Sequence, residues 1–205
     1  IEAGCRAVLG QGVLDFPSPD QPDPKRSRER AEQFLAAFPG HEPRLRPSLF
    51  CHAPYTCGAE TLGWVKQLCR DRGILFQIHV SETAAEVRAL RQQHGMAPVR
   101  YLEQLGILDD ATLCAHCVWV DDDEIGILAR CGAGVAHDPE SNMKLAAGVA
   151  PIPRMLAAGI AVGLGTDGCA SNDDLDILAE MDRAAKLHKV AALDPVVCSA
   201  PEALR

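Results

Sequence analysis

The feature that most constrains the fold is a regular alternation of short apolar runs with longer amphipathic segments. The runs have the length of buried strands, and the segments between them repeat apolar residues at the 3.6-residue spacing of a helix. The expected strands are residues 5–10, 45–51, 74–80, 112–118, 134–137 and 160–166. The expected helices are residues 27–38, 59–72, 83–93, 98–105, 122–130, 151–158 and 174–190. This order predicts a parallel sheet with helices packed outside it.

The number of strands bears on the architecture. Six strands with their helices fill the 205 residues, whereas a closed eight-stranded barrel takes ~250 residues. A barrel would therefore lack roughly two strand–helix units, and its outer strands, 5–10 and 160–166, would present unpaired backbone groups. We expect such a sheet to aggregate or to recruit complementary chain. The proline-rich segment 15–24 predicts an irregular loop, either a lid or a dimer contact.

Composition disfavours several classes of function. The chain carries 20 Lys and Arg against 28 Asp and Glu, a formal net charge of -8, which is the wrong sign for binding nucleic acid or anionic lipid. Its longest run without a polar side chain, residues 155–165, is far shorter than the roughly 20 residues of a membrane crossing. Cysteines scattered inside apolar segments are typical of reduced thiols. We expect a cytoplasmic protein with a small-molecule substrate and no nucleic-acid or membrane partner.

Titratable side chains stand at the carboxyl ends of five successive expected strands. They are His52, His79, His116, His137 and Asp167. In a parallel barrel the carboxyl ends of all strands face one mouth, where such folds place active sites. A single histidine is more often a surface or satisfied core residue, but five groups in register favour convergence on one site.

Glu82 follows His79 by three residues, in the loop after the strand. An imidazole there can hold a divalent metal while the carboxylate stands to one side as a proton carrier, as metal-assisted hydrolysis requires. The alternative for Glu82 is stabilisation of the helix that follows. Asp167, approached through Gly163 and Gly165, can ligate metal and accept a proton from water, and its alternative is a helix cap.

Other candidate groups receive structural interpretations. Cys114 and Cys117 would point to opposite faces of a strand, and the chain has no second Cys-x-x-Cys, so we expect no zinc site there. His41, His94 and His188 lie in helical or loop contexts and are expected at the surface.

Five ordered motifs resemble the amidohydrolase superfamily. They are His52-Ala53-Pro54-Tyr55-Thr56-Cys57, His79-Val80-Ser81-Glu82-Thr83, Ala115-His116-Cys117-Val118, His137-Asp138-Pro139-Glu140-Ser141-Asn142-Met143-Lys144-Leu145 and Gly165-Thr166-Asp167-Gly168. Within the superfamily the sequence is most similar to the 5-methylthioadenosine/S-adenosylhomocysteine deaminases, which are grouped with the chlorohydrolases. The resemblance implies an α/β fold, a TIM-type (β/α)8 barrel of the metal-dependent hydrolase kind. Residues 1–205 would supply strands three to eight of it, without the first barrel strands and a flanking β-sandwich domain.

The resemblance also implies roles for individual residues. His79 and Asp167 would be metal ligands, and the metal would be one divalent ion, zinc or alternatively iron. Glu82 would pass a proton to the purine ring, and His116 would lie beside the water that the metal activates. His52, together with Glu82, would contact the substrate.

The chain departs from the family pattern at two places. The family reads His-Asn-Pro where this chain has Asp138 in the middle position, and the flanking His137 and Asn142 would be mainly structural. The family also supplies two metal ligands from a His-x-His motif, which does not occur in these 205 residues. With only His79 and Asp167 as ligands, this chain alone is expected to bind metal poorly, because zinc sites generally have three or four protein ligands.

The resemblance implies that the parent enzyme is a zinc-dependent hydrolytic deaminase of an adenosine derivative, which releases ammonia. One alternative is another ring hydrolase of the superfamily: a guanine, cytosine or 8-oxoguanine deaminase, or a triazine chlorohydrolase. Another is an inactive fragment that lacks the His-x-His ligands. A homo-oligomer is also expected.

Overall fold

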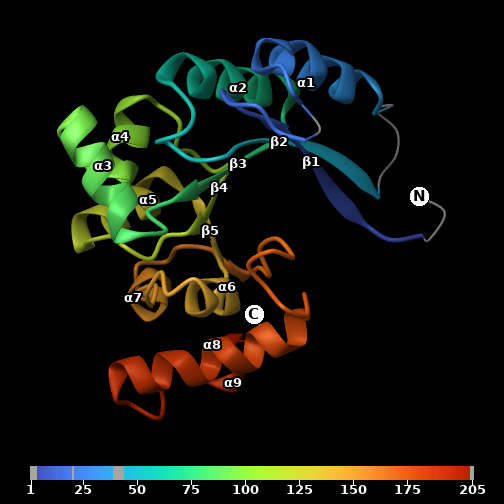
Figure 1. The fold of residues 1–205 in the computed structure, drawn as a ribbon. Coiled ribbons are helices and arrows are strands. Elements are labelled where there is room, and N and C mark those ends of the chain that lie inside the picture. The colour runs from blue at the N-terminus through green and yellow to red at the C-terminus, as the bar shows by residue number, and fades with distance from the viewer. Residues whose placement is uncertain (1–3, 20, 39–43, 204–205) are drawn as a thin grey trace.

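The computed structural model describes residues 4–19, 21–38 and 44–203. Six parallel strands form one sheet in the order β1-β2-β3-β4-β5-β6. They are β1 (Ala7–Val13), β2 (Leu45–Cys51), β3 (Leu75–Val80), β4 (Thr112–His116), β5 (Gly134–His137) and β6 (Val162–Leu164). Figure 1 shows the strands arranged in an arc that does not close. The predicted incomplete barrel is confirmed.

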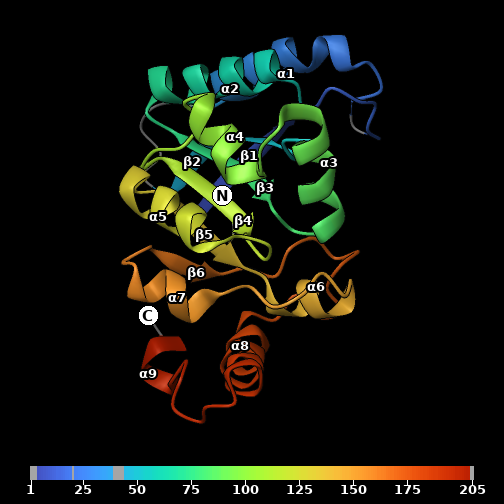
Figure 2. The ribbon, with the colours of Figure 1, turned by 90° about the vertical axis from the view of Figure 1, so that its left-hand side faces the viewer.

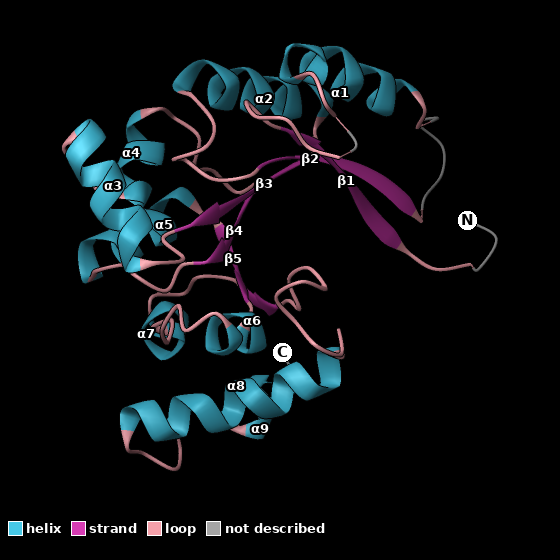
Figure 3. Cartoon of the chain, in the orientation of Figure 1, coloured by secondary structure: helices cyan, strands magenta, loops and turns pink. Residues whose placement is uncertain are grey.

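Helices connect successive strands and cover the outer side of the arc, as the colouring of Figure 3 makes plain. They are η1 (Pro24–Arg26), α1 (Ser27–Ala36), α2 (Ala59–Arg72), α3 (Ala84–His94), α4 (Pro98–Gln104), α5 (Asp122–Cys131), α6 (Pro139–Lys144), α7 (Ile152–Ala157), α8 (Ile177–Ala192) and α9 (Ala200–Ala203). The turned view in Figure 2 shows α1 and α2 at one end of the molecule and α8 and α9 at the other. None of the helices in the described part of the chain is long and apolar enough to cross a membrane.

Local sequence explains how individual elements begin and end. Helix α5 starts at a capping box in which the Asp121 side chain accepts from the Glu124 N–H and the Glu124 side chain accepts from the Asp121 N–H. It ends at Gly132, whose φ of 73° is the left-handed conformation that glycine adopts without strain. Such signals give each helix a defined length between two strands.

Alternation along β3 separates the two faces of the sheet. Phe76, Ile78 and Val80 are buried in the core that the sheet forms with the helices. Gln77 and His79 occupy the other phase and are partly exposed, because successive side chains of a strand point to opposite faces. The strand therefore delivers His79 to the inner side of the arc.

The structure corrects several expected boundaries. Strand β6 spans only Val162–Leu164 instead of 160–166, and β1 lies at Ala7–Val13 instead of 5–10. Helix α6 (Pro139–Lys144) was not among the expected helices. The segment after β1 is irregular, as predicted, apart from the bridge between Ser18 and Gln21 and the short η1.

The expectation that His188 lies at the surface is wrong. Its side chain is 2% exposed, because α8 turns Glu180, Ala184 and His188 towards the rest of the chain at four-residue spacing. His94 is half-buried and stacks on Tyr101 with 4.1 Å between ring centroids. His41 lies outside the described residues.

Candidate metal centre and active site

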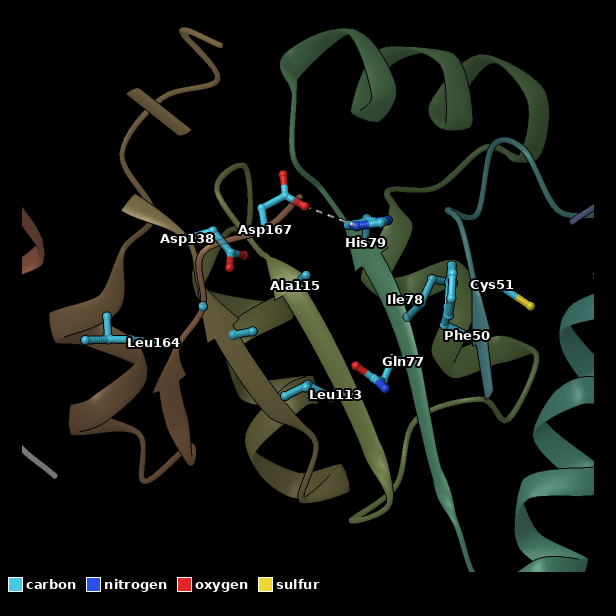
Figure 4. A pocket seen from close by; sticks show the side chains of 12 residues that line it. Phe50, Cys51, Gln77, Ile78, His79, Leu113, Ala115, Asp138, Leu164 and Asp167 are labelled. Carbon is cyan, nitrogen blue, oxygen red and sulfur yellow. Dashed lines mark ion pairs between the residues drawn. The ribbon is translucent and has the colours of Figure 1, made fainter. Parts of the chain in front are cut away.

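Three side chains from different strand ends converge at the inner rim of the arc. One possible ligand atom from each of His79, His116 and Asp167 lies within 4.8 Å of the other two. Figure 4 shows His79 and Asp167 facing each other beyond the strand ends, with 3.9 Å between Nε2 and Oδ1. Within the described part of the chain, this group includes neither Cys114 nor Cys117. The geometry therefore makes this rim the candidate metal centre.

His79 is fixed with one nitrogen available for a metal. Its Nδ1 lies 2.6 Å from the carbonyl oxygen of His52. Because a carbonyl can only accept, Nδ1 carries a proton and donates it, which leaves Nε2 as the nitrogen available to a metal ion. A ligating histidine is commonly held in this way through its second nitrogen.

His116 has the same arrangement. Its Nδ1 lies 3.0 Å from Oδ1 of Asn142, an amide oxygen that can only accept, and Oδ2 of Asp138 lies 3.5 Å away. Burial lowers the pKa of His116, so the ring is neutral with its proton on Nδ1. The free Nε2 lies 3.8 Å from Oε2 of Glu82.

One carboxylate oxygen of Asp167 faces the centre, and the other is held by hydrogen bonds. Its Oδ2 accepts hydrogen bonds from the hydroxyls of Ser141, at 2.8 Å, and Ser171, at 2.5 Å. Burial alone would raise the pKa of Asp167, but the hydroxyls of Ser171 and Ser141 outweigh it and hold the pKa below its usual value. Asp167 is therefore an ionised carboxylate whose Oδ1 faces His79.

His52 lies beside this centre, with its ring centroid 5.3 Å from that of His79. Its Nδ1 lies 2.8 Å from the hydroxyl of Thr56. Phe16 and Tyr55 meet the ring edge-on. Burial, and then the neighbouring His79, lowers the pKa of His52, so the imidazole is neutral and can exchange hydrogen bonds with a ligand at the rim.

A cavity of about 360 Å³ extends from the rim along the inner face of the strands. Gln77 and Leu113 line it lower down, and Asp138 lies next to Asp167 (Figure 4). Burial, and then the charge of Asp167, raises the pKa of Asp138 to about 7. A Cβ at Gly165 would lie 2.2 Å from Oδ1 of Asp138, so only glycine fits opposite this carboxyl group.

His137 does not join the centre. Its Nε2 lies 3.0 Å from Nε2 of His188, and its Nδ1 has no hydrogen-bond partner among the described residues. Burial lowers the pKa to about 3 for His137 and about 4 for His188, so both rings are neutral. Of the five groups expected to converge, four lie at the rim and His137 turns towards α8.

Some residues that shape the site were not singled out in the sequence. Ser141 and Ser171 orient Asp167, and the buried Glu86 binds the backbone on which Glu82 sits. A signal existed for Glu86, because it stands three residues after Thr83 in the Thr-x-x-Glu spacing of a capping box. Ser171 follows a strand in an irregular loop, where no periodicity assigns a role.

The donor set fits a divalent metal ion. Two imidazoles are held through Nδ1 and present Nε2 to the centre, and one ionised carboxylate faces His79. Nitrogen donors with a carboxylate are the ligands of catalytic zinc sites, and the outer hydrogen bonds already fix each ring.

Comparisons with known proteins agree with this geometry. The model of the amidohydrolase family matches residues 1–205. The chain is 46% identical over 206 residues to 5'-deoxyadenosine deaminase of Methanopyrus kandleri, covering 100% of this chain and 47% of that protein. It is 45% identical over 204 residues to 5-methylthioadenosine/S-adenosylhomocysteine deaminase of Aquifex aeolicus, covering 100% and 47%.

Among solved structures, an adenosine deaminase from Xanthomonas campestris with bound zinc matches with a TM-score of 0.94 at 33% identity. The match covers 100% of this chain and 46% of that one. The chain thus spans about half the length of the relatives it matches. Strand order, rim geometry and the full-length family match together identify it as a member of the amidohydrolase family.

Proposed function

We propose that the enzyme to which this chain contributes is a zinc-dependent hydrolytic deaminase that removes the 6-amino group of an adenosine derivative. The observation that carries the proposal is the convergence of His79, His116 and Asp167, with Glu82 beside them, at one rim. The names of the relatives, a 5'-deoxyadenosine deaminase and a 5-methylthioadenosine/S-adenosylhomocysteine deaminase, support an adenosine derivative as substrate. The first barrel strands with their His-x-His ligands, and the flanking β-sandwich, would lie outside residues 1–205.

His79 and Asp167 would hold the metal ion, with His116 within reach. A divalent ion bound there supplies a water molecule whose pKa is lowered towards ~7. The residues of this chain would bind the purine, orient the water and carry protons. His52 would contact the base at the side of the rim where Phe16 and Tyr55 lie.

The proton transfers follow from where the side chains lie. Glu82 would protonate N1 of the ring, which makes C6 more electrophilic. Asp167 would take one proton from water as the water oxygen bonds to C6, while Nε2 of His116 accepts a hydrogen bond from that water. Asp167 would then pass its proton to the amino group, so that the C6–N bond breaks and ammonia leaves. The remaining hydroxyl proton returns to Glu82, and the 6-oxo product keeps the proton on N1.

The central test is Glu82→Gln in the full-length enzyme loaded with zinc. Because a positioned acid or base contributes ~10²-fold or more, we expect the rate of ammonia release from 5-methylthioadenosine to fall by at least that factor. The exposed Glu32→Gln is the matched control and should leave the rate unchanged. Full activity of Glu82→Gln would show that Glu82 is not the proton carrier.

A substrate panel tests the reaction class separately. Ammonia release from 5'-deoxyadenosine, 5-methylthioadenosine and S-adenosylhomocysteine is expected to exceed release from guanine, cytosine or 8-oxoguanine. A chlorotriazine should yield no chloride. Preference for guanine, or chloride release from the triazine, would overturn the substrate assignment while leaving the family membership intact.

A further inference from the structure

We propose that Glu86 is a positioning residue that holds the Glu82 backbone in place for proton transfer. The inference rests on the proposed function, because it takes Glu82 to be the proton carrier. Glu86 lies in the first turn of α3, and its side chain contacts the loop that carries Glu82.

The carboxylate of Glu86 binds two consecutive peptide groups. Its Oε1 accepts from the N–H of Ser81 at 3.0 Å, and its Oε2 accepts from the N–H of Glu82 at 2.7 Å. Glu86 is 5% exposed and Ser81 is fully buried, so water has little access to replace these bonds. Burial raises the pKa of Glu86 to about 7, although the two peptide groups favour its ionised form. In that form the carboxylate accepts from each N–H more strongly than a neutral group would.

The segment that Glu86 holds has an unfavourable backbone conformation. Ser81 has a φ of 52°, in the left-handed region that is uncommon for residues other than glycine. From the loop after β4, the N–H of Trp119 donates to the carbonyl oxygen of Ser81 at 2.9 Å. Glu86 on one side and Trp119 on the other therefore fix the turn between β3 and α3.

Glu82 depends on this turn for its reach to the reacting atoms. Its Oε2 lies 3.8 Å from Nε2 of His116, at the edge of the centre. A misplacement of about 1 Å can lower a rate by 10²-fold even when the reacting groups are intact. Weakening the hydrogen bonds between Glu86 and this turn should therefore lower kcat while leaving KM nearly unchanged.

Helix α5 provides an internal control with the same local sequence pattern. Glu124 is 1% exposed and, like Glu86, follows a capping residue by three positions. Its carboxylate accepts from the N–H of Asp121 and closes an ordinary capping box. At α3, Thr83 also accepts from the N–H of Glu86, at 3.1 Å, but the Glu86 side chain extends to the two peptide groups before the cap.

The experiment compares Glu86→Gln, Glu124→Gln, Glu82→Gln and the double variant E82Q/E86Q in the full-length enzyme loaded with zinc. The glutamine amide keeps one acceptor oxygen, but its NH₂ group faces a backbone N–H, where two donors meet. One of the two hydrogen bonds to Ser81 and Glu82 is therefore lost. We expect Glu86→Gln to lower kcat for 5-methylthioadenosine by about 10- to 100-fold, with KM changed less than about 3-fold and zinc content unchanged. Glu124→Gln should leave kcat within about 2-fold even where it lowers the melting temperature.

Two further measurements separate positioning from a general loss of structure. The double variant should be no more than about 2-fold slower than Glu82→Gln, because residues that act as a unit are not additive. Hydrogen exchange at the amides of Ser81 and Glu82 should accelerate in Glu86→Gln and stay unchanged in Glu124→Gln.

The inference is overturned if kcat of Glu86→Gln stays within 2-fold of the parent, or if the double variant loses the product of the two single effects. Loss of zinc from Glu86→Gln would also overturn the inference, because the lower kcat would then result from the missing metal ion. If Glu86→Gln does not fold, Glu86→Asp replaces it under the same criteria, since it keeps the charge and withdraws the carboxylate by one methylene. Full activity of Glu82→Gln signals a different failure, that of the proposed function.

Discussion

Two pairs of histidines in this chain lie with their rings close together and differ in chemistry. His79 and His116 lie with ring centroids 5.4 Å apart, and His137 and His188 with centroids 4.9 Å apart. In the first pair each Nδ1 is bound to a fixed oxygen, so both Nε2 atoms remain free. In the second pair the two Nε2 atoms bind each other. The partner of the second nitrogen, and not burial or proximity, separates a candidate ligand pair from a structural pair.

The largest expected difference between the pairs is in metal binding and rate. His79→Asn removes a free Nε2 from the centre, and the loss of several kcal/mol of transition-state stabilisation corresponds to at least about 10³-fold in kcat. His188→Asn lies outside the centre and should keep kcat within about 3-fold. The measurements are zinc content by elemental analysis and ammonia release by both full-length variants. Zinc loss from His188→Asn equal to that from His79→Asn would break the distinction between the pairs.

The second pair, His137 and His188, should make the folded protein less stable in acid. The pKa values of His137 and His188 are about 3 and about 4 in the folded chain, below the ordinary value of 6.5. Groups with depressed pKa values contribute stability that is complete above pH 6.5 and is lost as the pH falls through the folded values. For His188 the 2.5-unit difference corresponds to about 3 kcal/mol at pH 4.

Urea unfolding at pH 7 and pH 4 measures this loss. We expect the free energy of unfolding to fall less in His188→Asn than in the parent protein, by about 2 kcal/mol. His94→Asn, at a half-buried histidine on α3 that stacks on Tyr101, serves as control and should follow the parent. An identical pH dependence in the parent and His188→Asn would mean that the second pair is not neutral in the folded state.

Much of the fold could be predicted from the sequence because strand and helix periods are local. Both β2 and α2 begin and end where the sequence predicts, at Leu45–Cys51 and Ala59–Arg72. The last strand could not be delimited, since residues 160–165 are apolar throughout while pairing with β5 covers only Val162–Leu164. Pairing is a tertiary property that an apolar run does not reveal.

The candidate site could be predicted in part. Position at strand ends selected His79, His116 and Asp167, but it also selected His137. Alternation along β5 explains why His137 does not join the centre. The side chains of Val135 and His137 point to the buried face of the sheet, while that of Ala136 points to the cavity. His116 shares the buried phase of Cys114, and its left-handed φ of 69° ends the strand and breaks that phase. The sequence around His116 contains no pattern that predicts this positive φ.

A smaller effect is expected from apolar replacements in the second pair at neutral pH. His188→Leu leaves Nε2 of His137 buried without a partner, which should lower the free energy of unfolding by about 2 kcal/mol. The double variant H137L/H188L removes both polar groups and should recover part of that loss. Urea unfolding at pH 7 compares the parent, the single variants H137L and H188L, and the double variant. A double variant less stable than the sum of the single variants would show that the pair packs by shape and not by its hydrogen bond.

The smallest expected effect concerns His52, which belongs with the first pair by its hydrogen bonding. The Thr56 hydroxyl donates to the carbonyl oxygen of Ala53, so it accepts the proton on Nδ1 of His52 and leaves Nε2 free. Thr56→Val removes this anchor. The loss of one hydrogen bond, about 1 kcal/mol, should raise KM for 5-methylthioadenosine by about 5-fold and leave kcat within about 2-fold.

Thr61→Val is the matched control for this prediction. Its hydroxyl donates to Asp15 at the start of α2, away from the imidazole, so its loss should affect stability and not KM. Initial rates of ammonia release over a range of substrate concentrations separate KM from kcat for both variants. Equal KM values in Thr56→Val and the parent would mean that the orientation of His52 is set by its aromatic neighbours Phe16 and Tyr55. In that case a fixed partner of Nδ1 would matter only for His79 and His116 at the candidate metal centre. The orientation of His52 on the substrate side of the rim would instead depend on packing.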